Sequence, residues 1–545
     1  MTLPRRTVLR AGAASLGALA CPRSGGAAPT VRFVGVDPAR GHLLRAREQP
    51  LPPPSQRRRA RVVVVGAGVA GLSAAWRLQR GGEHDLAVLE LDDEVGGTAR
   101  GGTLPRSRYP MGAHYLPVPQ PGFTALETLL EDLGVLVGRD AAGRAEYDPT
   151  MICRAPVERY RLRGQWHAGL YPDAGETADE RATLERFQAR LRALDRIGRD
   201  GRRLFALPLQ HSSDELRALD GETMAQWLAR ETLQGWRLQW LCDYGCRDDY
   251  GCTASQASAF AGLHHFVARG LEHERDRMLL TWPQGNAALC EALLQRLSLG
   301  ERLSLGTVVV AIDPDRGELL ALQARDGEAP RVIAWQAEHI LWAAPRFVLP
   351  HVLPPGRDPL PAGARTYTPW LVANVEVDVA PTGIGAPLSW DNVAIEGEHL
   401  GYVVANHLEP LSQRNRGGAV LTYYEPRPAD DAAALARGRE ALLSASAEAL
   451  AEHVIAQLAA MHPSLPPHIR AIDLCRWGHA MVRPVPGAMF GPAAAQASAP
   501  VGRVRPCAAD CSALPLFEQA FANGVAAAEA VLARGDANVA TMLPT

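Results

Sequence analysis

Residues 61–78 read RVVVVGAGVAGLSAAWRL, and this stretch decides the fold. Val62 to Val65 form a β-branched run, which is typical of a parallel strand buried on both faces. Gly66, Gly68 and Gly71 follow in the pattern GxGxxG, and the next residues continue at helical spacing. Strand, glycines and helix together predict a turn that holds a dinucleotide diphosphate at the helix N-terminus.

Each residue of this turn has a mechanical role. Gly66 allows the tight turn, Gly68 and its neighbour Ala67 let the diphosphate approach the backbone, and Gly71 lets the helix pack on the strand. A second apolar strand over 86–89 ends in Glu90, about 20 residues after the last glycine, where a carboxylate accepts the ribose hydroxyls. The pattern therefore predicts a complete dinucleotide site.

The next segment distinguishes between dinucleotides. Residues 90–100 read ELDDEVGGTAR, and 111–114 read MGAH. Both resemble the flavoprotein superfamily of amine oxidases, protoporphyrinogen oxidase and phytoene desaturases. The resemblance implies FAD as cofactor, with Gly96, Gly97 and Arg100 against its diphosphate, and a turn at Gly112 and Ala113 that passes the flavin ring.

Later segments extend the resemblance in the same order along the chain. Residues 282–286 read WPQGN before a helical run to 297, 302–312 resemble a strand pair in which the Val309 backbone holds the adenine, and 339–345 resemble the returning strand. In the C-terminal flavin segment, Asp510 aligns with the residue at the ribityl–phosphate region, and Leu516 falls at an aromatic position before the last helix. Ala509 and Gln519 replace two usual glycines there, so different backbone geometry at the flavin is expected.

The chain is too long, at 545 residues, for one compact core. We expect an α/β fold in which a Rossmann-like FAD-binding domain is interleaved with a mixed helical and sheet substrate domain. The expected parts are a signal at 1–30, a surface linker at 31–58, the FAD-binding domain at 59–120, 280–346 and 470–535, the substrate domain at 121–279 and 347–469, and a tail at 536–545. Helices are expected over 183–197, 222–240 and 431–461, and strands over 371–379 and 419–424.

Composition narrows the function classes. Apolar residues make up 47% and charged residues 21%, and the net charge of −2 gives no reason to expect a nucleic-acid partner. All 57 basic residues are arginine. Amine oxidases of the superfamily commonly place a lysine near flavin N5, and the missing lysine counts against a standard member, as does Leu516 at the aromatic position.

The N-terminus is expected to be a targeting segment. Arg5 and Arg6 precede a short apolar run over 8–20 with small residues at its end, as in a twin-arginine export signal. This run is too short for a membrane span. We expect the export machinery as a partner, a periplasmic location, and cleavage after Ala20, with a lipid anchor on Cys21 as the alternative.

The nine cysteines do not have the spacing of a zinc site, so no metal is expected. Folding before export takes place in the reducing cytoplasm, which favours buried thiols, with room for one disulfide.

The substrate-side candidates are less certain than the cofactor residues. Asp243, Asp248 and Asp249 lie among tyrosines, and such a mixture suits a cationic substrate such as a polyamine. The other interpretation, which we favour for the last two, is a solvated helix end that pairs its own charges. His114 either accepts a proton beside the flavin or makes a structural hydrogen bond, and Trp477 aligns with a wall of the site.

These observations predict an FAD-dependent oxidase or dehydrogenase that takes a hydride from a small organic substrate, for which an amine or polyamine is one candidate. Two alternatives stay open. One is a desaturase or isomerase of a polyene, which needs no lysine. The other is a non-catalytic FAD-binding partner protein. This alternative remains because Ala509 and Gln519 replace two usual glycines near the flavin.

Overall fold

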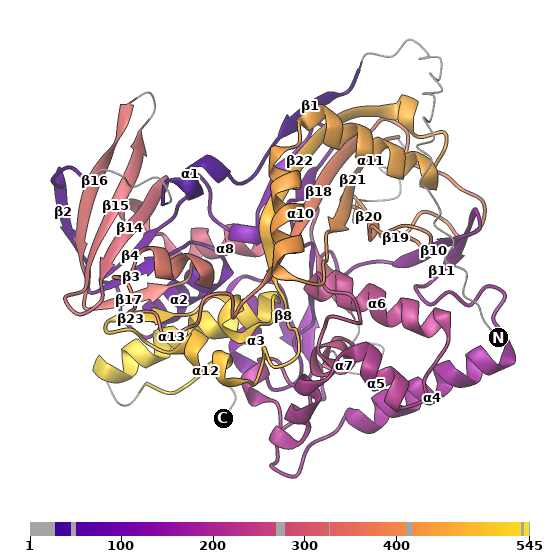
Figure 1. Ribbon diagram of the computed structural model, residues 1–545, viewed down its shortest axis with the longest axis horizontal. Helices are drawn as coiled ribbons and strands as arrows, with labels where there is room; N and C mark the ends of the chain where they lie inside the picture. Colours follow the sequence, from indigo (N-terminus) through magenta and orange to yellow (C-terminus); the bar gives the residue numbers. More distant parts are fainter. Residues whose placement is uncertain are drawn as a thin grey trace, which may run out of the picture.

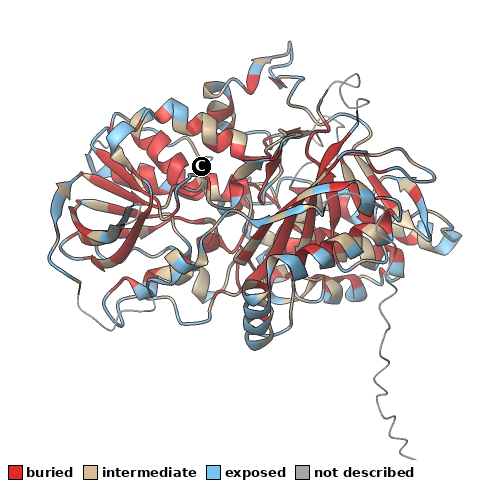
Figure 2. Ribbon diagram, turned by 90° about the horizontal axis from the view of Figure 1, so that it is seen from above, coloured by how far each residue is buried: buried red, intermediate tan, exposed pale blue. Residues whose placement is uncertain are grey.

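The computed structural model describes residues 28–44, 51–268, 278–325, 328–409, 417–535 and 539–543. The expected signal residues Arg5, Arg6 and Cys21 lie outside the described residues. Two lobes lie side by side, each built around its own sheet (Figure 1). Both sheets are largely buried, while the exposed residues gather on the outer faces of helices (Figure 2).

The first lobe contains a five-stranded parallel sheet. Its strands, in spatial order, are β13 (Leu303–Ser304), β4 (Leu86–Leu89), β3 (Val62–Val65), β17 (His339–Trp342) and β23 (Val504–Pro506). Helices pack against one face: α2 (Val69–Arg80), α8 (Ala287–Leu297) and α13 (Phe517–Gly535). Segments from both ends of the chain thus complete one Rossmann-like sheet, as expected.

The valine run of β3 is continuous because both faces of this sheet are covered. Val62 and Val64 pack in the core beneath the helices, whereas Val63 and Val65 pack against the second layer. That layer is a four-stranded sheet of β14 (Thr307–Asp313), β15 (Glu318–Arg325), β16 (Glu328–Gln336) and β2 (Gln56–Arg59).

The second lobe contains an eight-stranded mixed sheet. Its spatial order is β1 (Thr30–Phe33), β22 (Ile469–Val482), β18 (Tyr367–Val377), β21 (Ala419–Pro426), β20 (Gly401–Val404), β19 (Asp391–Ala394), β10 (Glu158–Leu162) and β11 (Gln165–Ala168). On one face lie α10 (Ala432–Ser444) and α11 (Ala447–Met461). Toward the other lie the helices α4 (Ala178–Leu194), α5 (Met224–Arg230), α6 (Trp236–Tyr250) and α7 (Ala259–Val267).

Shorter elements join the lobes. They are the ribbons β5 (Gly101–Thr103) with β6 (Arg108–Pro110), β7 (Tyr115–Pro117) with β12 (Leu279–Thr281), and β8 (Leu136–Arg139) with β9 (Ala145–Tyr147), together with the helices α1 (Pro38–His42), α3 (Thr124–Asp132) and α12 (Pro492–Ser498).

Two expected helices are each divided in the structure. The helix expected over 222–240 is interrupted between Arg230, where α5 ends, and Trp236, where α6 begins, and Gly235 in this break has a φ of +139° that no helix accommodates. The helix expected over 431–461 is broken at Ala445, where the backbone is extended and Ser446 caps the start of α11. Apolar periodicity continues across both breaks and therefore hides them.

Two expected boundaries are also wrong. Residues 31–58 do not form a simple surface linker, because β1 pairs with β22 in one lobe and β2 pairs with β16 in the other. The strand β22, expected within the FAD-binding part that began at 470, belongs to the eight-stranded sheet instead. The arginine- and proline-rich composition of residues 31–58 hides the strand pattern of β1 and β2, which both lie at sheet edges.

No helix within the described ranges is long and apolar enough to cross a membrane.

Candidate functional site

The glycine turn between β3 and α2 is held by close backbone contacts. A Cβ atom at Gly71 would lie 1.8 Å from the Gly66 carbonyl oxygen, and one at Gly66, where φ is +100°, would lie 2.9 Å from Ala344 N. At Gly68 a Cβ would meet Gly97 Cα at an ordinary 3.7 Å. Gly66 and Gly71 are therefore required by the protein itself, whereas Gly68 leaves room for a ligand to approach the backbone.

Glu90 lies directly beside this turn. Its carboxylate accepts a hydrogen bond from the Ala67 N–H at 2.6 Å and another from the Asp92 N–H at 3.0 Å. Burial raises the pKa of Glu90, while these backbone donors favour its charged form. The structure brings Ala67, Gly68 and Glu90 together as the sequence predicted, at the N-terminus of α2, which no side chain caps.

Arg100 supplies the first test of whether an anionic cofactor fits. Its side chain is 4% exposed, and its Nε and Nη2 atoms have no hydrogen-bond acceptor among the described residues. Nη2 lies 3.1 Å from Asp92 Oδ2, but the approach is not that of a hydrogen bond. A buried guanidinium with unused donors is costly by itself and fits a diphosphate.

Asp510 supplies a second test. One carboxylate oxygen accepts hydrogen bonds from the Arg346 N–H at 2.6 Å and the Tyr367 hydroxyl at 2.7 Å. The other oxygen, Oδ1, is buried without a partner in the part of the chain that the structure describes. This free acceptor suits a ribityl hydroxyl, and burial raises the pKa of the carboxyl.

Between the glycine turn and Asp510, four segments that are distant in the sequence contact one another. Gly96 donates to the Ala67 carbonyl at 2.8 Å. A Cβ at Gly112 would lie 2.2 Å from Thr98 O, and one at Gly285 would lie 2.6 Å from Ala113 O. Thr98 and Ala113 nevertheless stay exposed between these elements. The segments that resemble the flavoproteins thus meet along one accessible surface.

Two other residues implied by the resemblance flank this surface. Val309 lies in β14 next to a bulge in its pairing with β15, and Thr307 N in the same strand donates to Glu90 O at 2.7 Å. Leu516 is half-buried, and its carbonyl accepts the Ala520 N–H at 3.0 Å in the first turn of α13. Both positions agree with the resemblance, while their contacts with a cofactor stay a prediction.

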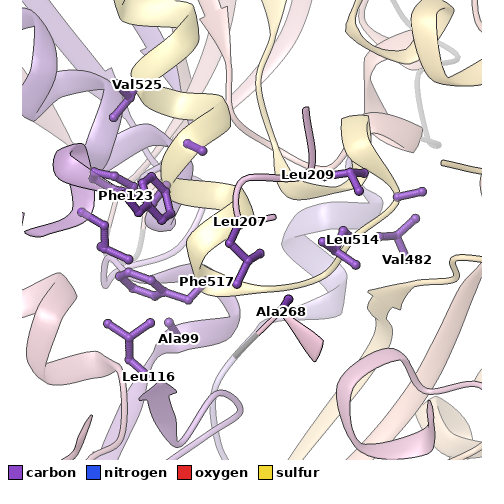
Figure 3. Packing of buried hydrophobic residues seen from close by; sticks show 14 of the residues in the cluster. Ala99, Leu116, Phe123, Leu207, Leu209, Ala268, Val482, Leu514, Phe517 and Val525 are labelled. Atoms are coloured by element: carbon purple, nitrogen blue, oxygen red, sulfur yellow. The ribbon is translucent and has the colours of Figure 1, made fainter. Parts of the chain in front are cut away.

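The unusual Gln519 has a structural role at the start of α13. Its side chain is fully buried; Oε1 accepts the Leu209 N–H at 2.8 Å, and Nε2 donates to Asn523 Oδ1 at 2.8 Å and to Gln210 Oε1 at 3.0 Å. Around this network the side chains of Leu207 and Leu209 lie close to those of Phe517 and Leu514 (Figure 3). Gln519 therefore joins the C-terminal helix to residues 207–211.

The predicted flavin turn at 111–114 and the preceding Pro110 are tied to the large sheet by consecutive carbonyl groups. Asn374 Nδ2 of β18 donates to Pro110 O at 3.1 Å, Trp477 Nε1 of β22 to Met111 O at 2.6 Å, and Tyr424 of β21 to Gly112 O at 2.9 Å. Trp477 is thus a support of this turn. Its role as a wall toward the substrate stays a prediction, and sequence reasoning missed Asn374 and Tyr424.

His114 follows this turn and is surrounded by aromatic rings. The centroids of Tyr115 and Tyr424 both lie 4.9 Å from that of His114, and the Trp390 centroid lies at 5.3 Å. Burial lowers the pKa of His114 to about 3, against a smaller opposite effect of Asp249. The imidazole is therefore neutral at physiological pH, and it can accept or donate a hydrogen bond without adding a positive charge.

The three predicted aspartates of α6 have different environments. Asp243 forms an ion pair with Arg247 at 2.8 Å and accepts the Ala254 N–H at 2.9 Å, so it supports the end of the helix. Asp249 is buried and lies 2.6 Å from His265 Nδ1 of α7. The expectation of a solvated helix end is wrong for Asp249, because α7 and the large sheet cover this part of α6.

Asp248 belongs to a group of carboxyls that sequence reasoning missed in part. Glu158 of β10 and Asp391 of β19 are direct partners in the sheet register. Asp248 and Glu158 both raise the pKa of Asp391, after the larger effect of burial, and burial also raises that of Glu158. Three carboxyl groups therefore lie near one another inside the protein. They belong to Asp248, Glu158 and Asp391, which we call the carboxyl group cluster.

Aromatic side chains border the carboxyl group cluster. The Tyr244 hydroxyl donates to Asp391 at 3.0 Å, and the pKa of Tyr424 is raised by burial first and then by Asp248 and Asp391. Each of the three carboxyl residues keeps partial solvent exposure despite this depth. His114 is likewise half-buried, and Tyr424 lies next to it. No signal in the sequence joined Glu158 to Asp391, because their pairing depends on the sheet topology.

Within the described ranges no group of three potential ligands is arranged to hold a metal ion. Eight cysteines in these ranges are free thiols, and all except half-buried Cys153 are buried.

Comparison with known proteins agrees with this geometry. A fold with a Rossmann-like sheet completed by distant segments, and a second sheet facing its ligand edge, defines an FAD-dependent oxidoreductase of the two-domain type. The profile of the family described as flavin-containing amine oxidoreductase matches residues 69–532. The chain belongs to this family, and FAD is its cofactor.

Solved structures share the fold at low sequence identity. A putrescine oxidase, determined with bound putrescine, is 18% identical with a TM-score of 0.60, covering 88% of this chain and 100% of its own. The cyclohexylamine oxidase of Brevibacterium oxydans is 16% identical with a TM-score of 0.59, covering 88% of this chain and 99% of its own. A fatty acid isomerase of P. acnes is 15% identical with a TM-score of 0.57, covering 86% of this chain and 97% of its own.

Curated relatives match shorter stretches. Mitochondrial dimethylglycine dehydrogenase of Mus musculus is 26% identical over 132 residues, which span 24% of this chain and 15% of the relative. Polyamine oxidase 1 of Zea mays is 57% identical over 37 residues, 7% of each chain. These matches span only a small part of the relatives, and the substrate therefore has to be argued from the site.

Proposed function

We propose that the protein oxidises a cationic amine, such as a diamine or polyamine, by transfer of a hydride to FAD. The single observation that carries this proposal is the carboxyl group cluster beside aromatic rings. Burial, followed by the neighbouring Asp248 and Glu158, raises the pKa of Asp391, so this carboxyl resists ionisation unless a cation enters. An ammonium group offers that charge, and desolvated carboxylates bind it through charge-assisted hydrogen bonds.

The remaining residues suit the same substrate. Tyr244, Tyr424 and Trp390 supply ring faces for cation–π contact with an ammonium group. His114 stays neutral, so it adds no repulsion and can accept a hydrogen bond from a substrate N–H. Bound FAD supplies the hydride acceptor. The protein holds the substrate, excludes water, and takes the proton that an ammonium group must lose before its carbon is oxidised.

The two alternative functions have less support. A polyene substrate offers no charge to the carboxyl group cluster, whose desolvation would then be uncompensated. The non-catalytic alternative rested on Ala509 and Gln519, but the Gln519 side chain is satisfied by Leu209, Gln210 and Asn523. That glycine replacement has a packing explanation and is compatible with catalysis.

Anaerobic flavin reduction tests the proposal. Putrescine should bleach the flavin, whereas 1,4-butanediol, which has no charge, should not. Asp391→Asn should raise the apparent KM for putrescine about 10- to 100-fold, because a hydrogen bond to a charged group contributes about 1.5–3 kcal/mol. Asp243→Asn is the control and should leave KM unchanged. Equal KM values for Asp391→Asn and the unsubstituted protein would refute the role of the cluster.

We also propose export through the twin-arginine pathway to the periplasm, on the strength of Arg5, Arg6 and the apolar run that follows. Loading FAD before export removes the need for free cofactor outside the cytoplasm. Replacing both arginines with lysine should leave precursor in the cell, and normal processing of that variant would rule the pathway out. Mass measurement of the processed N-terminus would distinguish cleavage after Ala20 alone from lipidation of Cys21.

A further inference from the structure

Residues 30–44, which we call the N-terminal strap, connect the two lobes. Figure 1 shows β1 along the edge of the large sheet and α1 between the two lobes. Arg32 binds Asp473 of β22 through two hydrogen bonds of 2.6 and 2.8 Å, and Val34 N donates to Leu474 O at 2.9 Å. The strap is therefore anchored on the substrate lobe.

The other end of the strap binds the loop that carries the cofactor residues. Arg40 makes hydrogen bonds to both carboxylate oxygens of Asp93, at 2.9 and 3.0 Å, and to Leu91 O at 3.1 Å. These partners directly follow Glu90, whose carboxylate lies against the glycine turn. A planar guanidinium that binds a carboxylate and a backbone carbonyl together fixes the position of the loop.

A shorter connection leads from the strap to the unused donors of Arg100. The backbone N–H of Asp37 lies close enough to the Asp92 carboxylate to favour its charged form, and Asp92 lies 3.1 Å from Arg100 Nη2. Arg100 is the buried side chain whose Nε and Nη2 atoms await an acceptor. Asp37, Asp92 and Arg100 thus form a chain of contacts that ends where the diphosphate of FAD fits.

Gly35 lets the strap pass close to the large sheet. Its φ is +88°, and a Cβ there would lie 2.7 Å from Cys475 Sγ. Val34 and Val36 pack against the aromatic cluster that borders the flavin turn. The strap therefore adds apolar contacts to its polar ones, and its position depends on both lobes.

We propose that the N-terminal strap is a retention latch for FAD. Its docking positions Arg100 through Asp92 and holds the loop of residues 90–100 against the cofactor. By thermodynamic linkage, bound FAD must favour docking of the strap by the same free energy with which the strap favours bound FAD. The latch acts on cofactor retention and does not depend on which substrate the enzyme oxidises.

The first test measures FAD release from the full-length holoprotein, by the rise of flavin fluorescence on dilution. Arg40→Gln should speed release about fivefold, the effect of losing one partly exposed ion pair. Arg316→Gln, which removes an exposed ion pair with Glu318 far from the loop, should leave the rate unchanged. The exchange Arg40→Asp with Asp93→Arg should restore slow release, which separates the pairing from a general loss of stability.

The second test follows trypsin cleavage within the strap, where Arg32 is 56% exposed. Cleavage after Arg32 and Arg40 should be several times faster in the apoprotein than in the FAD-loaded protein, and Asp93→Asn, which keeps both cleavage sites, should remove most of this difference. Equal cleavage with and without FAD, or an unchanged release rate in Arg40→Gln, would overturn the latch. Failure of the amine proposal would affect neither measurement.

Discussion

The protein contains two buried acidic regions that are held in different ways. At the cofactor end, Glu90 and Asp510 each accept hydrogen bonds from fixed donors, mostly backbone N–H groups. At the substrate end, Glu158 and Asp391 are partners in a parallel strand pair, and burial, followed by Asp248 and Glu158, raises the pKa of Asp391. The first region is organised before its ligand arrives, whereas the proposed amine would stabilise the second. A cofactor that stays bound and a substrate that must leave need these different solutions.

Glycine substitutions should disrupt the preorganised region most. Gly71→Ala would place a Cβ 1.8 Å from Gly66 O, and we expect a loss of about 3 kcal/mol or more in unfolding free energy. Gly68→Ala meets only ordinary contacts in the protein, and it should stay folded but fail to bind FAD, because the new methyl group blocks the diphosphate. Thermal unfolding and flavin content check both. Tight FAD binding by Gly68→Ala would contradict the assigned site.

The amide network at Gln519 should have the next largest effect. Gln519→Ala removes the acceptor of Leu209 N and the donor to Gln210 Oε1, which should cost about 2 kcal/mol of unfolding free energy. FAD should remain bound, since the side chain supports the helix and not the cofactor. Chemical denaturation followed by flavin fluorescence measures both properties. A variant as stable as the parent would show that the network is dispensable.

Removing a charge from the substrate region should raise the free energy of unfolding, whereas Gly71→Ala and Gln519→Ala lower it. The folded-state pKa of Asp391 is raised, so the folded protein binds more protons than the unfolded chain, and stability falls as pH rises from about 4 through the folded pKa. Asp391→Asn, which keeps the acceptor for Tyr244, should gain about 1 kcal/mol or more at pH 8 without substrate, since one pKa unit corresponds to about 1.4 kcal/mol. The gain should vanish near pH 4. Thermal unfolding across this range tests it, and a loss at pH 8 would contradict mutual repulsion.

The smallest effect is expected at Asp243. This residue is on the same helix as Asp248 but pairs with Arg247 near the surface, so Asp243→Asn should change unfolding free energy by about 1 kcal/mol or less. Its KM for an amine should equal that of the parent. A large rise in KM would mean that the negative charge of α6 acts as a whole and that the cluster is not the site of recognition.

The sequence predicted that the glycine turn, the valine strand and Glu90 come together, because these residues follow one another at fixed spacing and a local turn determines their geometry. The substrate region was predicted only in part. Asp248 and Asp249 were identified among tyrosines, but Glu158 and Asp391 meet only through the register of β10 with β19, some 230 residues apart in the chain. Edge strands such as β1 were missed because arginine and proline obscure their alternation. Long-range pairing therefore limits what one sequence reveals.

Proton release on amine binding tests the contrast between the two regions most directly. The reduced holoprotein, kept anaerobic so that no turnover occurs, is titrated with putrescine by calorimetry in buffers of different ionisation enthalpy between pH 5 and 8. An entering cation lowers the pKa of the carboxyl group cluster, so protons should be released, and Asp391→Asn should release fewer. Binding without proton release, or the same release from Asp391→Asn, would contradict the account.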